Sequence, residues 1–167
     1  MTTTKSPEIW ICNLDGFDRD DTRLIKEVFE NPNGWRRHGK YVMLASANKL
    51  PSSLQNFFSM YKTAETVMKV LYPQPHLSGL SVTDRSRKFT VVHIHATNWG
   101  RIPPGSDFLD LREYRVALIN HELSHVFGHD HVKCLTKGMF ADVRQQPSMH
   151  LGGCIPNTNV ILHDSVV

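Results

Sequence analysis

Residues 121–131 read HELSHVFGHDH, and this segment constrains the fold more than any other part of the chain. On an α-helix, His121 and His125 lie one turn apart and point to the same side. Gly128 follows, and glycine readily takes the left-handed conformation that ends a helix and turns the chain back. His131 can then approach the same point in space. The segment therefore predicts a helix that ends near Gly128, with three imidazole groups gathered at its end.

Gathered imidazole nitrogens are a candidate site for one Zn²⁺ ion, which histidine binds at ~2.0–2.1 Å. Three neutral ligands leave a fourth position open for water, as in catalytic rather than structural zinc sites. Glu122 projects about 100° round the helix from His121, so it is poorly placed to bind the ion but well placed to take a proton from a water on it. We therefore expect His121, His125 and His131 to be the ligands and Glu122 the general base.

Four further side chains leave alternatives open. His129 competes with His131 as the third ligand if the helix continues past Gly128. His93 and His95 share one face of a predicted strand, where they form a second metal site or a purely structural pair. Trp99 either lines the cleft or belongs to the core.

The rest of the chain predicts a single α+β domain. Its length of 167 residues and its 40% hydrophobic content suit one globular core. Strands are predicted over residues 8–14, 40–46, 80–83 and 88–95, and helices over 18–30, 52–71 and 107 to about 128, the last capped by Asp107. Residues 98–105 are predicted to form a loop. This order favours a mixed sheet packed on helices, with an upper subdomain of about residues 8–131 and a small, loop-rich lower one of about 132–167.

Charge and hydropathy narrow the function classes. The net charge of +3 is too small to indicate a nucleic-acid partner. No apolar run approaches the ~20 residues of a membrane helix, and residues 1–16 lack the pattern of a signal peptide. The chain is thus expected in the cytoplasm if complete, or outside the cell if it is a mature form. None of the three cysteines forms a CxxC pair, but Cys134 and Cys154 could form a disulfide if the compartment is oxidising.

The segment also resembles a known family. HELSHVFGHDH matches the metzincin pattern HExxHxxGxxH at every fixed position. The resemblance implies a zinc peptidase with a twisted sheet, a central active-site helix and a methionine turn beneath the metal. Residues 147–150 read PSMH and resemble the corresponding stretch of astacin-like enzymes, which implies Met149 as that methionine. Leu151 stands where astacins carry a tyrosine, so no transition-state tyrosine carries over.

A wider stretch, residues 88–156, resembles an uncharacterised actinobacterial family of secreted metzincin-like domains. Its shared features include Tyr114-Arg115, the histidine motif, Gln145-Gln146 and the two cysteines Cys134 and Cys154. This resemblance favours the Cys134–Cys154 disulfide. In that family the methionine precedes the paired glutamines, where this chain has Arg144. The extra cysteines of archaemetzincins and the cysteine switch of matrixins are missing.

The leading hypothesis is a monomeric zinc endopeptidase that cleaves an extended peptide or protein substrate beside an edge strand, with residues 88–95 as the candidate strand. A second hypothesis keeps the same chemistry but acts on another amide, such as a cell-wall peptide. A third is a non-catalytic, zinc-stabilised interaction module. Glu122 argues against the third, because a structural site needs the histidines but not that carboxylate.

Overall fold

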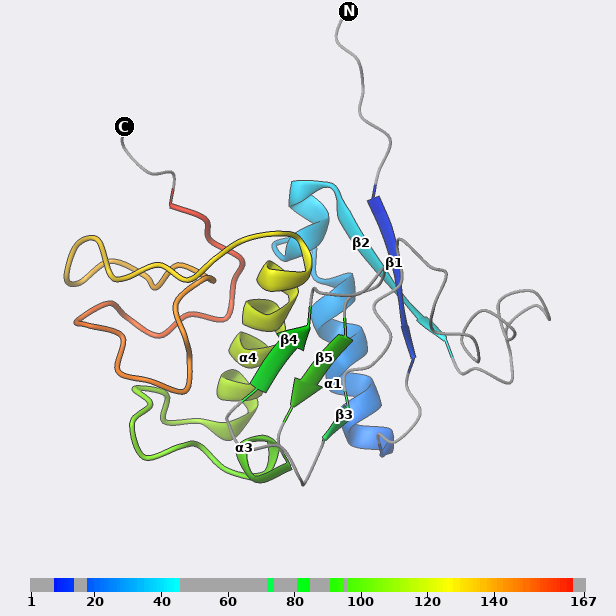
Figure 1. Cartoon of the computed structure of the whole chain (residues 1–167), viewed down its shortest axis with the longest axis horizontal. Coiled ribbons are helices and arrows are strands. Elements are labelled where there is room, and N and C mark those ends of the chain that lie inside the picture. The colour runs from blue at the N-terminus through cyan, green and yellow to red at the C-terminus, as the bar shows by residue number, and fades with distance from the viewer. Residues whose placement is uncertain are drawn as a thin grey trace, which may run out of the picture.

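The computed structural model describes residues 8–13, 18–45, 72–73, 81–84, 91–94 and 96–163. Within these residues, helices and short strands occur together, so the protein is an α+β structure (Figure 1). The helix predicted over residues 52–71 and the position of His95 lie outside the described part. No helix in the described part is both long and apolar enough to cross a bilayer.

Helix α1 spans Arg19–Glu30, in agreement with the helix predicted over residues 18–30. Asp18 caps it, because its carboxylate accepts a hydrogen bond from the backbone N–H of Asp21 at 2.8 Å. The apolar side chains spaced three and four residues apart are buried: Leu24, Ile25, Val28 and Phe29. This stripe turns α1 toward the core and toward the helix that carries the histidine motif.

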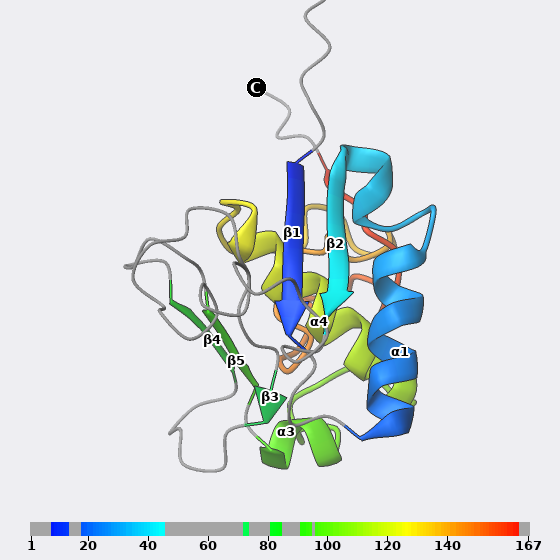
Figure 2. The same ribbon diagram turned by 90° about the vertical axis from the view of Figure 1, so that its right-hand side faces the viewer.

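Strands β1 (Glu8–Asn13) and β2 (Lys40–Ala45) pair in parallel, with Glu8 opposite Lys40 and Asn13 opposite Ala45. Helix α1 and the short 3-10 helix η1 (Trp35–His38) lie between these strands in sequence. The arrangement is a strand–helix–strand crossover, the usual way to connect parallel strands. Figure 2 shows the two strands side by side next to α1.

Strands β3 (Tyr72–Pro73), β4 (Ser81–Asp84) and β5 (Val91–Ile94) form a second ladder in the order β3-β5-β4. β5 is parallel to β3 and antiparallel to β4, so the pairing is mixed, as predicted. Two expectations were wrong for the described strands. The strand predicted over residues 88–95 is not an edge, because both of its sides are paired, and the two ladders are separate rather than one sheet.

Helix α4 (Leu111–Val126) runs through the middle of the described structure, between the strands and the loops of residues 132–163 (Figure 1). Its side chains from Tyr114 to Val126 are almost all buried, as expected for a core helix. The prediction of Asp107 as its cap was wrong. Asp110 is the cap and accepts from the backbone N–H of Glu113 at 2.8 Å. The carboxylate of Asp107 instead accepts from the backbone N–H of Leu151 at 2.6 Å.

The short helix α3 (Ala96–Gly100) forms where the sequence predicted the start of a loop. Its Trp99 is 5% exposed and donates from Nε1 to the carboxylate of Asp21 at 2.9 Å. The guanidinium carbon of Arg115 lies 4.9 Å from the centre of the Trp99 ring. Trp99 therefore belongs to the core and ties α1, α3 and α4 together, which decides against a role in lining the cleft.

Residues 132–163 form loops that pack beside α4 (Figure 1). Backbone hydrogen bonds hold the loops together, such as Ala141 N–H to Ile155 O at 2.8 Å and Val143 N–H to Ile161 O at 2.9 Å. A disulfide joins Cys134 to Cys154 across 20 positions of the sequence. Residues 132–163 are thus held by a cross-link and by loop contacts rather than by helices.

Removing the disulfide is expected to lower the free energy of unfolding by about 2–4 kcal/mol. The cross-link closes a loop of 20 residues and so reduces the conformational entropy of the unfolded chain. Urea unfolding of wild type and of Cys134→Ser/Cys154→Ser measures the difference. Dithiothreitol should shift the wild-type transition and leave the double variant unchanged. A wild-type transition that does not respond to dithiothreitol would contradict this prediction.

Candidate metal centre

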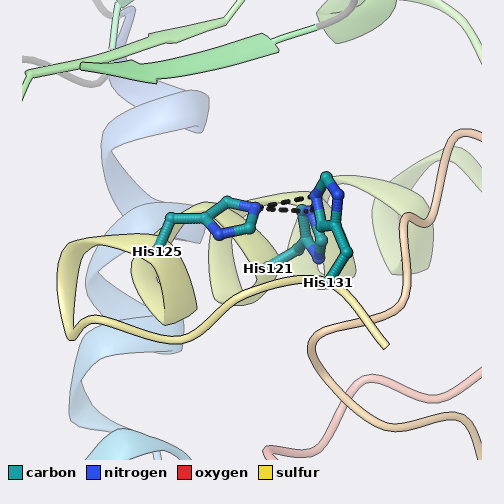
Figure 3. Close-up of side chains that lie close together, drawn as sticks. All are labelled: His121, His125 and His131. Carbon is teal, nitrogen blue, oxygen red and sulfur yellow. Dashed lines mark hydrogen bonds between the residues drawn. The ribbon is translucent and has the colours of Figure 1, made fainter. Parts of the chain in front are cut away.

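Three imidazole side chains converge at the C-terminal end of α4 (Figure 3). His121 and His125 come from the helix, one turn apart, and His131 comes from the segment that follows it. The Nε2 atom of His121 lies 3.2 Å from that of His125 and 3.2 Å from that of His131, and the third pair is 2.9 Å apart. The structure therefore brings together the three residues predicted as metal ligands.

The Nδ1 atoms of the two helix histidines, which point away from the cluster, each form a hydrogen bond with a backbone carbonyl. His121 Nδ1 lies 3.0 Å from the carbonyl oxygen of Val143, and His125 Nδ1 lies 2.8 Å from that of His129. A carbonyl oxygen only accepts, so each Nδ1 must carry the proton and donate it. Each Nε2 atom then has a bare lone pair. Lone pairs that face one another at about 3 Å repel, unless a cation lies between them.

The donor set fits one zinc ion. Tetrahedral coordination with zinc–nitrogen distances of about 2.0–2.1 Å places ligand nitrogens about 3.3 Å apart. The observed separations of 2.9–3.2 Å lie close to this value. Carbonyl partners on the outer nitrogens are also what metal-bound histidines usually have. The geometry and the chemistry of these residues thus fit a metal site.

Burial keeps the central ligand in its metal-binding form. His121 is 3% exposed, and this burial, followed by repulsion from His125, lowers its pKa to about 3. Burial and then His125 also lower the pKa of His131. Both rings are therefore neutral near pH 7, and the neutral imidazole is the form that binds metal.

The turn after α4 decides which histidine ring joins the cluster. Gly128 has φ +90°, a value that L side chains rarely adopt, and its backbone N–H donates to His125 O at 3.0 Å. This turn directs the His129 ring away from the cluster and onto Trp35, with ring centres 5.9 Å apart and planes inclined by 25°. His129 therefore contributes its carbonyl oxygen, to His125, and not its ring.

Glu122 is only 4% exposed and follows the first ligand on α4. Its charge acts on Tyr114, two turns earlier on the helix, whose hydroxyl is buried without a hydrogen-bond partner in the described structure. Burial first, and then the negative charge of Glu122, raise the pKa of Tyr114. The phenol is therefore neutral at physiological pH.

An open groove of about 500 Å³ begins at His131. One wall is the segment after the third histidine and the other is the segment around Met149; the lining residues are His131, Val132, Lys133, Cys134, Gln145, Gln146, Met149, His150, Leu151 and Gly152. The disulfide joins Cys134 of this lining to Cys154. The disulfide thus lies beside the groove.

Met149, the candidate Met-turn residue, lies on the groove beside the histidines. Its side chain is 52% exposed. Val143, which is 7% exposed, contacts His121 from the loop side through its carbonyl oxygen. Sequence reasoning missed Val143 and its flanking residues because a backbone acceptor requires no particular side chain.

An α+β fold with three convergent imidazoles, two on its central helix and one just after it, defines a candidate metalloprotein. The sequence matches the family described as "Protein of unknown function (DUF3152)" over residues 12–155. The chain belongs to this family, and the histidine cluster lies within the matched region. Comparisons with the curated proteins and with the solved structures gave no match.

Proposed function

We propose that this protein is a zinc-dependent endopeptidase of the metzincin type, with one catalytic ion held by His121, His125 and His131. The convergence of three Nε2 atoms, with Nδ1 of His121 and of His125 held by carbonyl oxygens, carries the metal assignment. When bound, zinc would polarise an amide carbonyl and make a water molecule more acidic. The motif HExxHxxGxxH, with the Gly128 turn as its structural counterpart, supports the metzincin assignment.

Glu122 is the proposed general base. Its carboxylate would accept a proton from the attacking water and return it to the leaving amine. Its place next to His121 on α4, within the buried end of the helix, supports this role. Burying a carboxylate costs free energy, and a site that only needed to hold metal would not require one.

The groove beside His131 supports a peptide as the substrate class. Its volume of about 500 Å³ can accept one or more amino-acid side chains on one side of the scissile bond. The outer strand of the second described ladder, β4, contacts α4. An extended peptide could add to β4 and so lie along the helix that carries the ligands.

The disulfide supports a location in an oxidising compartment. Disulfides persist in oxidising surroundings and are rare in the cytosol. Because Cys134 and Cys154 are joined beside the groove, we propose that the protein works outside the cytosol.

Zinc content and cleavage of a peptide library test the proposal. Wild type is expected to bind one zinc per chain, to cleave peptides, to lose cleavage with a chelator and to regain it with added zinc. Bound zinc without cleavage of any peptide would leave a zinc-stabilised module. Cleavage confined to non-peptide or cell-wall amides would replace the substrate class and keep the chemistry.

Charge in the groove predicts a preference. Lys133 and His150 line it, and none of the described lining residues is acidic. Substrates with an acidic side chain at the groove position should therefore be cleaved more efficiently than basic ones. Lys133→Glu is expected to change this ratio by about 2–5-fold, since an exposed ion pair contributes only about 0.2–1 kcal/mol. The measurement is kcat/KM for paired acidic and basic peptides, with Lys137→Glu, outside the groove lining, as the control.

A further inference from the structure

Asp142 and Arg144 form an ion pair on either side of Val143, in the loop that lies against α4. Arg144 Nη2 is 2.6 Å from Asp142 Oδ2, and the side chains are 17% and 3% exposed, respectively. The intervening carbonyl of Val143 accepts the hydrogen bond from His121 Nδ1 at 3.0 Å. We infer that this ion pair is a positioning device for the ligand His121, which it orients through the backbone of Val143.

The Asp142 carboxylate organises the turn. Oδ1 accepts from the backbone N–H of Arg144 at 2.9 Å and from its Nε at 2.8 Å. Oδ2 accepts from the other end of the guanidinium group and from the backbone N–H of His163 at 2.7 Å. Arg144 also donates to the carbonyl of His163 at 2.7 Å. The pair therefore fixes the peptide units on both sides of Val143 and ties them to the end of the described chain.

Neighbouring bonds leave the Val143 carbonyl little freedom to turn. The Val143 N–H donates to Ile161 O at 2.9 Å. The side chain of Gln145 also holds this turn. Its Oε1 accepts from Asp142 N–H at 3.1 Å, and its Nε2 donates to Leu151 O at 3.2 Å. His121 Nδ1 thus donates to a carbonyl whose peptide units are held by hydrogen bonds within the same loop.

A role in orientation explains why charged residues occupy this buried turn. Burial raises the pKa of Asp142, but hydrogen bonds from Arg144 and His163 outweigh it and lower the pKa below its usual value. The carboxylate is therefore ionised. A buried ion pair adds little net stability compared with apolar residues of similar size. Partners that orient a metal-bound histidine, in contrast, alter metal affinity by about 10–100-fold.

The inference rests on the metal site of the proposed function but not on cleavage, so it is tested by zinc affinity. In Asp142→Asn, an amide N–H₂ replaces one carboxylate oxygen. In one orientation of the amide, this N–H₂ faces the donors of Arg144 and His163; in the other, it replaces the oxygen that accepts from the backbone N–H of Arg144. We expect this variant to weaken zinc binding about 10–100-fold. Arg144→Lys retains the charge but not the forked geometry and should give a smaller loss. Competition with a chromophoric chelator measures both, on protein whose circular dichroism matches wild type.

Glu27→Gln is the matched control. The exposed side chain of Glu27, on α1, pairs with Arg112, which lies near the start of α4 and away from His121. This variant should leave zinc affinity unchanged. Folded variants of Asp142 and Arg144 that bind zinc as tightly as wild type would overturn the inference.

A second readout needs no variant: ¹⁵N–¹H spectra of zinc-free wild type should show His121 protonated at Nδ1 only, with slow proton exchange. A mixture of tautomers would equally overturn it. Zinc binding without peptide cleavage would refute the proposed endopeptidase activity, but the zinc-affinity test of Asp142 and Arg144 would still apply.

Discussion

Glu122→Gln is expected to reduce peptide cleavage by about 10²–10⁴-fold, the contribution of a positioned general acid–base group. Glutamine keeps the size and the hydrogen-bonding capacity of the side chain but cannot accept a proton near pH 7. Glu122 is 4% exposed on the core helix α4, so the near-isosteric change should leave the packing intact. The loss should therefore appear in kcat at unchanged zinc content.

Glu113→Gln provides the control for this variant. Glu113 lies on the same helix but is exposed in its first turn, distant from the histidines. Its substitution should leave both zinc content and kcat at the wild-type level. If Glu122→Gln cleaved peptides as fast as wild type while holding zinc, another group would have to be the base.

His131→Ala is expected to lose zinc affinity by more than the ~10–100-fold that removal of an outer-shell partner costs. The variant removes one of three converging nitrogens and leaves only the two histidines of α4. His131 lies in the exposed segment after the helix, so the free energy of unfolding of the zinc-free protein should change little. Isothermal titration with zinc measures the affinity, and thermal unfolding of the zinc-free form checks the fold.

His129→Ala should behave differently, although His129 is only two positions away. Its contribution to His125 is the backbone carbonyl, which alanine retains. The ring stacks on Trp35, so its removal should affect stability more than zinc affinity. Loss of zinc in His129→Ala but not in His131→Ala would overturn the ligand assignment.

The candidate ligands could be predicted because their arrangement is local. His121 and His125 are placed by the helical repeat alone, and Gly128 marks the turn that redirects the chain to His131. The same local rules located α1 and its cap Asp18. Each of these features depends on residues within a few positions of one another, so sequence spacing determines it.

Competition between local signals explains the errors. Asp107 and Asp110 are both acceptable caps, and the chain uses Asp110 because Asp107 bonds to Leu151, 44 positions away. Residues 88–95 were predicted to form an edge strand, but β3 and β4 pair with the two sides of β5.

The sequence by itself determined the helix, the three histidines, the adjacent carboxylate and the glycine turn, because helical periodicity and backbone conformation act over short distances. Only the tertiary structure decided that Val143 orients His121, that His129 turns its ring to Trp35 and that Asp142 and Arg144 hold the loop between them. The first two contacts join segments far apart in the chain, through a backbone carbonyl and a ring stack that no residue spacing encodes. The Asp142–Arg144 pair is local, but its loop lies against α4 only in the folded chain.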